Sequence, residues 1–364
     1  MHATFGERYR PYNMRYLILL LLISSASYGQ MKYFSGKQLD KFLKVQMKSL
    51  GLPGLSIAVI RNGKIVYHRA LGVTNTTTPA KVDEQSIFEA ASLSKPVFAY
   101  LALKMADKGL LDLDKPLYQY LPFPELEYDQ RYKLITARMV LDHTTGFPNW
   151  RWFDLADPAR QIKRGDMYIK KDPGTFTYSG EGYHYLAKVL AHLNHLPLHT
   201  LDSVFRQEVA VPLGMQYAWF TYNDFMGQHK VTGHKDGKVE GRRWPMAFPD
   251  EDSTSFGAAG KLHTEAVSYA HFLIGLMNDE THAEMFKAQT SVPENYNEGV
   301  VAWGLGLAIR PTKYGIAYQH GGNNGNFQSG CLFYKEKKSG YVFFTNCNKG
   351  DVFNERLQVF LEIL

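Results

Sequence analysis

The hydrophobic pattern changes twice along the chain, and this order of segments constrains the fold more than any single motif. Near the start, Leu55–Ile60 and Lys64–Ala70 alternate like β-strands and are joined through Asn62-Gly63, a dipeptide typical of a tight hairpin turn. Strand-like alternation returns at Trp303–Arg310 and continues towards the end of the chain. Between these parts, apolar residues recur mostly at helical spacing. The pattern predicts an α+β chain whose sheet is built from both ends of the sequence.

Helical spacing predicts most of the remaining segments. The predicted helices are 38–50, 94–110, 136–141, 180–196, 201–211, 264–277 and 355–364. The later predicted strands are 303–310, 317–320, 330–334 and 341–345, with the basic run 335–338 as an exposed hairpin turn. This order predicts a discontinuous α/β sheet domain, formed by 31–90 and 256–364, that holds a mainly helical domain over 91–255.

The first 29 residues have the pattern of a secretory signal peptide. Arg15 precedes the apolar run Tyr16–Ile23, and small residues follow up to Gly29, near which cleavage is expected. The apolar run is too short to cross a bilayer, so no permanent membrane span is expected. No cysteine stands near the cleavage point for a lipid anchor, and Met14 is an alternative start. We therefore expect an exported protein, either periplasmic or secreted.

Composition argues against one class of partner and leaves one covalent link open. The net charge of +6 is scattered, without a basic stripe interleaved with aromatic residues, so nucleic acid binding is not expected. The two cysteines, Cys331 and Cys347, fall on neighbouring strand-like runs. Alternation does not decide whether they face the same side of a sheet. A structural disulfide between them is therefore an open alternative in an exported chain.

A serine and a lysine stand one helical turn apart in the stretch Phe88–Val97, which reads FEAASLSKPV. Ser92 and Lys95 share a face at the start of a predicted helix, within hydrogen-bonding reach. A serine hydroxyl becomes a good nucleophile only when a base takes its proton, and a lysine serves as that base when its pKa is depressed. A Ser-x-x-Lys also arises by chance in a chain of this length. The pair becomes a candidate nucleophile and base only if other stretches support it.

Two further stretches carry candidate site residues. Tyr178 lies where a glycine-rich loop meets a predicted helix, and a tyrosine beside a lysine ammonium can be driven toward phenolate and carry protons. An aromatic that only packs at the helix start is the alternative. His320-Gly321-Gly322-Asn323 follows the strand-like run 315–319, where glycines let a substrate lie along the strand edge. A backbone N–H at this edge would join that of Ser92 in binding a carbonyl oxygen, although a plain glycine-rich turn is also possible.

Other residue combinations point less clearly to chemistry. His192, His195 and His199 recur at near-helical spacing, but Pro197 interrupts the helix and no acidic or cysteine ligand stands close by, so no metal site is expected. The adjacent pair Asp142-His143 invites a Ser-His-Asp interpretation. Neighbouring residues on a helix point in different directions, so we do not expect a relay between them.

Taken together, these stretches resemble the serine β-lactamase and penicillin-binding-protein superfamily. The likeness is to the branch that holds class C β-lactamases, D-alanyl-D-alanine carboxypeptidases and related esterases, and it runs from about Leu39 to about Asn348. The stretches that carry it occur in the same order: FEAASLSKPV, GLLDLDKPLYQYLP, LDHTTGFPNW, GTFTYSGEGY, VPLGMQ, FGAAGKLHT, WGLGL and QHGGNNGNF. The resemblance implies a β-lactamase/transpeptidase-like fold, with an antiparallel sheet flanked by helices and the active site between the two domains.

The resemblance also implies a role for each candidate residue. Ser92 would be the acylated nucleophile, Lys95 its partner base, and Tyr178 the group that passes the proton to the leaving group. Whether the lysine or the tyrosine is the acylation base is unsettled within the superfamily. The third motif of the family would comprise His320 and Gly322. The backbone N–H of Asn323 would complete the oxyanion site with that of Ser92.

The chain departs from the family pattern at two positions. The second motif, commonly Tyr-x-Asn, reads Tyr178-Ser179-Gly180 here, so the amide that contacts the lysine and the substrate is missing. The third motif has His320 where many β-lactamases have lysine, which weakens attraction for the carboxylate of a β-lactam. Both departures argue against efficient β-lactamase activity and leave esterase or peptidase chemistry open.

The resemblance implies an exported serine hydrolase that forms an acyl-enzyme with small esters or D-amino-acid-containing amides, including cell-wall-derived peptides. This chemistry needs no metal or organic cofactor. The alternative is a penicillin-recognising protein that binds or senses its ligand and is acylated slowly or not at all. Tyr178-Ser179-Gly180 is the feature that keeps this alternative open.

Overall fold

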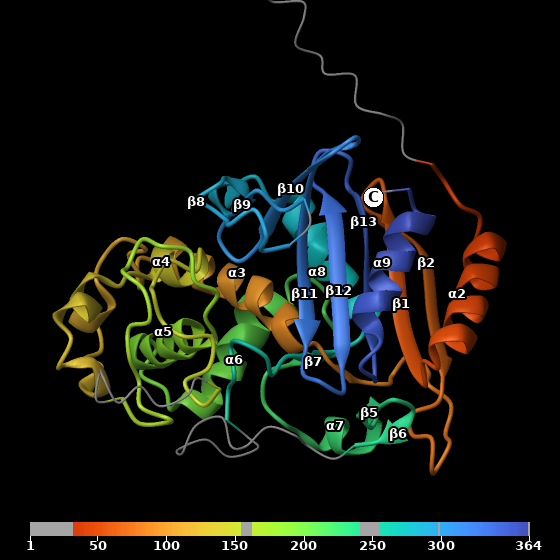
Figure 1. Cartoon of the computed structure of the whole chain (residues 1–364), viewed down its shortest axis with the longest axis horizontal. Coiled ribbons are helices and arrows are strands. Elements are labelled where there is room, and N and C mark those ends of the chain that lie inside the picture. Colours follow the sequence, from red (N-terminus) through yellow and green to blue (C-terminus); the bar gives the residue numbers. More distant parts are fainter. Residues whose placement is uncertain (1–31, 154–161, 241–254, 298, 363–364) are drawn as a thin grey trace, which may run out of the picture.

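One large antiparallel sheet forms the centre of the computed structural model, which describes residues 32–153, 162–240, 255–297 and 299–362 (Figure 1). Its eight strands follow the order β2-β1-β13-β12-β11-β10-β9-β8. Their bounds are β1 Gly54–Arg61, β2 Lys64–Gly72, β8 Thr290–Ser291, β9 Ala302–Trp303, β10 Ala308–Thr312, β11 Gly315–Asn323, β12 Gln328–Tyr334 and β13 Ser339–Thr345. Strand β1 pairs with β13, so the sheet joins the two ends of the described chain, as the alternation predicts.

Local turn chemistry determines two hairpins of this sheet. Asn62 and Gly63 join β1 to β2 with φ angles of 50° and 70°, the left-handed conformation that this dipeptide favours. The basic run Lys335–Lys338 joins β12 to β13. Both hairpin predictions are confirmed.

Helices cover both faces of the sheet, and each face has its own apolar core. Helices α2 (Gly36–Leu50) and α9 (Gly350–Phe360) pack on one face, in a core that includes Ile57. Helix α8 (Ala266–Asn278) packs on the other, in a core that includes the next residue, Ala58. Successive residues of β1 thus enter opposite cores, as the two-residue period of a strand requires. The α+β class, with an antiparallel sheet flanked by helices, is confirmed.

Most of the regular secondary structure between β2 and α8 is helical (Figure 1). Its helices are α3 Ser94–Asp107, α4 Ala137–Leu141, α5 Gly180–Leu193, α6 Leu201–Phe205, which continues as one π turn over Arg206–Ala210, and α7 Asp224–His229. Short 3-10 turns lie at Ala91–Leu93, Leu117–Gln119, Pro124–Leu126, Gln130–Leu134 and Leu198–Thr200, with one more at Ala283–Phe286. Small strands interrupt the helices at β3 Phe88–Glu89, β4 Ala218–Trp219, β5 His234–Lys235, β6 Lys238–Val239 and β7 His263–Thr264. The division into domains at 90 and 256 stays a prediction.

Some predictions differ from the structure. The predicted strand 303–310 is divided into β9 and β10, and the predicted helix 355–364 begins earlier, at Gly350. Cys331 and Cys347 are unbonded and lie in the two cores on opposite faces of the sheet, so the open alternative of a disulfide is wrong. The proposed signal peptide lies outside the described residues. Among the helices that are described, none has the length and apolar character needed to cross a membrane.

Candidate active site

Ser92 lies in a tight 3-10 turn, Ala91–Leu93, that connects β3 to α3. Ala91, just before it, has a φ of 48°, which is costly for a residue with a Cβ and must be held by its surroundings. Two contacts of Ala90 supply that hold: its N–H donates to Leu262 O at 2.8 Å, and its carbonyl accepts from Ser329 Oγ at 2.7 Å. The turn therefore fixes the Ser92 hydroxyl at the start of α3.

Lys95 lies one turn later on α3, and its amine is buried beside the Ser92 hydroxyl. Lys95 Nζ is 3.2 Å from Ser92 Oγ and donates to Ala259 O at 2.8 Å. Burial lowers the pKa of Lys95 to about 7, because removal from water disfavours the charged form. A lysine with such a pKa can accept the serine proton near neutral pH. The Ser-x-x-Lys spacing thus predicted a real contact between the two side chains.

Tyr178 lies against both residues of this pair. Its ring centroid is 4.8 Å from Lys95 Nζ, and its phenol contacts the Ser92 hydroxyl. Burial has the larger effect and raises the pKa of Tyr178 well above its usual value, so the phenol is neutral at rest. Burial disfavours charge on both groups and so opposes the phenolate form of Tyr178 that the sequence left open.

Strand β11 brings the third motif to the same place and leaves part of its edge open. Strand β12 pairs with it through Asn323, whereas β10 pairs only with Gly315–Gln319. Within the described chain, residues 320–323 thus have no strand on their second edge, and an extended substrate can add there as a further strand. The strand-edge interpretation of this stretch gains support over a plain glycine-rich turn.

His320 presents a neutral ring at this edge. Its Nδ1–H donates to Gly321 O at 2.7 Å, so Nε2 is the unprotonated nitrogen, and this buried atom has no partner among the described residues. Burial, together with the charge of Lys95, lowers the pKa of His320 to about 3. A neutral imidazole in place of a lysine offers no positive charge to a substrate carboxylate.

Gly322 allows β11 to lie against the turn that carries Ser92. A Cβ added there would be 2.4 Å from Ala90 O and 2.3 Å from Ser329 Oγ, far closer than real contacts allow. Asn323 follows at the end of the strand, with its side chain bonded to Asp351 and to the N–H of Gly325. The side chain of Asn323 is therefore engaged locally, and its backbone N–H as an oxyanion donor stays a prediction.

We expect Gly322→Ala to lower the reactivity of Ser92 about 100-fold, the order of loss that a displacement of about 1 Å can cause. The added methyl group would push β11 away from Ala90. Labelling of Ser92 by a fluorophosphonate probe measures the effect. Gly321→Ala is the matched control, because a Cβ there meets nothing within 4 Å. Equal labelling rates in the two variants would contradict the close-approach role.

Trp150 explains why the second motif ends in glycine. A Cβ on Gly180 would lie 2.7 Å from Cζ2 of the Trp150 ring, so the indole occupies the space that an asparagine side chain would need. Asn149 bonds the start of α5 through its carbonyl, which accepts from the N–H groups of Gly180 and Glu181. The Trp150 ring therefore fills the space beside position 180, where no side-chain amide stands.

The sequence does not predict a catalytic role for His143, yet this residue lies at the site. Its ring centroid is 4.2 Å from that of Tyr178 and 5.1 Å from that of Trp303, and the residue is fully buried. Asp142 does not bond to it but accepts from the N–H and hydroxyl of Thr144. Membership of the ordered stretch LDHTTGFPNW was the only sign of its position. As predicted, the two adjacent residues form no relay.

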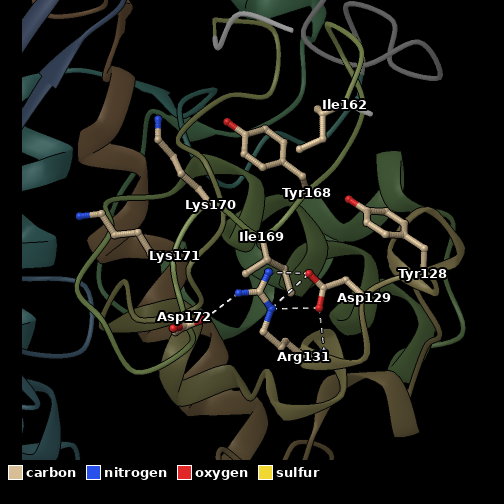
Figure 2. Close-up of a pocket in the computed structure, with 9 residues that line it drawn as sticks. All are labelled: Tyr128, Asp129, Arg131, Ile162, Tyr168, Ile169, Lys170, Lys171 and Asp172. Atoms are coloured by element: carbon tan, nitrogen blue, oxygen red, sulfur yellow. Dashed lines mark hydrogen bonds and ion pairs between the residues drawn. The ribbon is translucent and has the colours of Figure 1, made fainter. Parts of the chain in front are cut away.

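A cavity of about 390 Å³ lies elsewhere in the mainly helical part (Figure 2). Arg131 extends across it and binds Asp129 and Asp172, so its charge is already balanced. None of the candidate site residues lines this cavity. No group of three metal-ligating side chains occurs among the described residues. The chemistry-bearing side chains thus gather around Ser92 and not at this cavity.

Comparisons with known proteins agree with this arrangement. The sequence model of the Beta-lactamase family matches residues 39–362. PbpX of Bacillus subtilis (strain 168), named as a penicillin-binding protein, is 24% identical over 283 residues, which cover 76% of this chain and 68% of that protein. Protein flp of Staphylococcus aureus (strain MW2) is 23% identical over 211 residues, or 55% of this chain, and the chain spans only 41% of its length.

A solved structure with the same fold is the D-alanine carboxypeptidase AmpC from Burkholderia cenocepacia. It superposes with a TM-score of 0.68 and 21% identity, over 86% of this chain and 93% of that one. At this identity the likeness establishes the shared fold alone. The β-lactamase/transpeptidase-like architecture expected from the sequence is therefore confirmed.

Proposed function

Since the chain belongs to the Beta-lactamase family, we propose that it is a serine hydrolase whose Ser92 is acylated by a small ester or amide. One observation carries this proposal. The buried amine of Lys95 lies 3.2 Å from Ser92 Oγ and has a pKa of about 7, so the nucleophile has a base in place. Family membership alone does not require an active site, whereas this pair is equipped for proton transfer.

The groups around Ser92 suit a two-step reaction. Lys95 accepts the proton as Ser92 Oγ attacks the carbonyl carbon, and the backbone N–H groups of Ser92 and Asn323 bind the oxygen that gains charge. The neutral phenol of Tyr178 donates its proton to the leaving group and regains one from the Lys95 ammonium. Water then attacks the acyl-enzyme, and the carboxylic acid leaves Ser92 free. Because Tyr178 is uncharged, Lys95 is the better acylation base.

The residues around Ser92 favour substrates that do not depend on a carboxylate for binding. His320 is neutral, and Trp150 fills the place of the amide beside Gly180. Small esters and neutral peptide derivatives therefore fit the site better than β-lactams do. D-amino-acid peptides derived from the cell wall remain a second substrate class, supported by the structural likeness to a D-alanine carboxypeptidase. The leader-like N-terminal pattern supports export to where such peptides occur.

We expect a fluorophosphonate probe to form one covalent adduct, on the peptide that contains Ser92. Intact-protein and peptide mass spectrometry would locate it. Ser92→Ala keeps the backbone of the turn and removes the nucleophile, so this variant should carry no adduct. Labelling of Ser92→Ala at the wild-type rate would show that the reactive group lies elsewhere.

Steady-state kinetics then separates a hydrolase from a sensor. Wild type and Ser92→Ala are compared on p-nitrophenyl esters, a chromogenic cephalosporin and a D-Ala-D-Ala peptide. Repeated turnover of an ester or peptide by wild type alone supports the proposed hydrolase. A single burst equal to the enzyme concentration, with no further turnover, would instead identify a slowly acylating penicillin-recognising protein.

A further inference from the structure

His143 holds the backbone on both sides of Tyr178. Its carbonyl accepts from the N–H of Thr177 at 2.7 Å, and its ring Nδ1 accepts from the N–H of Ser179 at 3.1 Å. One residue therefore binds the N–H groups of the residues just before and just after Tyr178. His143 itself has a φ of 61°, a left-handed conformation that turns both of its acceptors toward this segment.

The ring of His143 also supports the side chain of Tyr178. The two rings lie 4.2 Å apart at 34°, and the far surroundings of the imidazole are aromatic, with Trp303 at 5.1 Å and Tyr183 at 5.3 Å. Such contacts restrict the tyrosine ring to a narrow range of positions. His143 thus restrains Tyr178 in two ways, through hydrogen bonds to the neighbouring backbone and through contact between the two rings.

The protonation state of His143 follows from its contacts. A backbone N–H points at Nδ1, so Nδ1 is unprotonated and the ring proton resides on Nε2. Burial, assisted by the nearby amine of Lys95, lowers the pKa of His143 well below its ordinary value. The ring is therefore neutral over the working pH range, so a structural contact and not its titration defines its role.

We propose that His143 is a positioning residue that aims the Tyr178 phenol at the leaving group of the substrate. The proposal rests on the proposed function, because it assumes that Tyr178 donates a proton when the acyl bond breaks. A phenol displaced by a fraction of an ångström loses the hydrogen-bond geometry that proton donation needs. Loss of His143 should therefore matter only for leaving groups that must be protonated.

Two substitutions separate the acceptor of His143 from its ring. His143→Asn places Oδ1 where Nδ1 stands, and asparagine tolerates the left-handed backbone, so the bond from the Ser179 N–H is kept. His143→Phe keeps an aromatic ring against Tyr178 and leaves the buried Ser179 N–H without its acceptor. Asp142→Asn, on the neighbouring buried residue whose carboxylate accepts from the N–H and hydroxyl of Thr144, is the matched control for effects on the loop.

The test compares two esters of one acid, a p-nitrophenyl ester and an ethyl ester. Nitrophenolate leaves without a proton, whereas ethoxide needs one. We expect His143→Phe to lower kcat/KM for the ethyl ester by about 30-fold and for the nitrophenyl ester by no more than about threefold. His143→Asn should stay within about threefold of wild type on both esters, since it restores the acceptor. Asp142→Asn should leave the ratio of the two esters unchanged.

Circular dichroism melting and the rate of Ser92 labelling show whether each variant is folded. The positioning role would be overturned if His143→Phe lowered kcat/KM equally for both esters, or did not lower it for the ethyl ester. A failure of His143→Asn to rescue the ethyl ester would also overturn it. If wild type neither forms the Ser92 adduct nor hydrolyses either ester, the proposed function itself is wrong, which is a distinct result.

Discussion

Lys95→Met is expected to lower kcat/KM about 10⁴-fold, the upper range of what a positioned general base contributes. Methionine keeps the volume of the side chain in its buried position, so the fold should persist while the proton acceptor is lost. Kinetics on the best ester of the substrate panel would measure the loss. Melting curves that match wild type would show that the variant is folded.

The same residue predicts the pH dependence of the reaction. Lys95 acts as a base only when it is unprotonated, and its pKa is lowered to about 7 by burial. Below this pH the unprotonated fraction falls tenfold per unit, so kcat/KM should rise with pH through about 7 and then level off. Lys95→Arg is the charged control, because arginine does not deprotonate in proteins. A Lys95→Arg enzyme with wild-type activity, or a rate that falls between pH 6 and pH 8, would refute the assignment of the base.

Arg151→Met is expected to lower the free energy of unfolding by about 3–5 kcal/mol. The guanidinium is buried and binds Glu181 through Nε at 3.1 Å and Nη2 at 3.0 Å, and it also binds Glu125. Glu181 is the second residue of α5 and is fully buried, so removal of the arginine leaves its charge without this partner in a site away from water. Urea unfolding of wild type and variant gives the difference directly.

A second substitution distinguishes the lost charge pair from lost packing. Glu181→Gln keeps the acceptor for the N–H of Arg151 and removes the negative charge. In the double variant, Arg151→Met with Glu181→Gln, we expect about half of the lost stability to return, since no unpaired charge is buried. A double variant no more stable than Arg151→Met would attribute the loss to the shape of the side chain.

Local signals account for the parts of the fold that the sequence predicted well. The Asn62-Gly63 turn and the alternation of β1 and β2 depend on residues close together in the chain, and both are found as expected. The division of the predicted strand 303–310 has a different cause. β9 and β10 pair antiparallel with Trp303 opposite Ala308, so the chain reverses direction between them. The N–H of Gly304 donates to Leu307 O at 2.8 Å, and Gly306 has a φ of 85°, a left-handed conformation that glycine permits and that the alternation of apolar residues did not indicate.

The candidate site shows the same limit. The contact between Ser92 and Lys95 follows from a helical turn and was predictable. The neutral states of Tyr178 and His320 result from burial by distant segments, which residue spacing does not reveal. His143 was missed because its role depends on a left-handed backbone and on a bond to Ser179, 36 residues away. Adjacency in sequence, which argued against a relay with Asp142, gives no information about such a partner.

The pairing of β1 with β13 affects how the chain can fold while it is being synthesised. Leu55 lies opposite Thr345, so this pairing cannot form on the ribosome until nearly the whole described chain has been made. Strand β11, which lies against the Ser92 turn, also emerges late, long after the serine. Contacts between residues this distant in sequence form slowly, because the chain loses the conformational entropy of the long loop before the strand pairing stabilises it. A nascent chain thus carries its nucleophile early but completes the surroundings that activate it only near the end of synthesis.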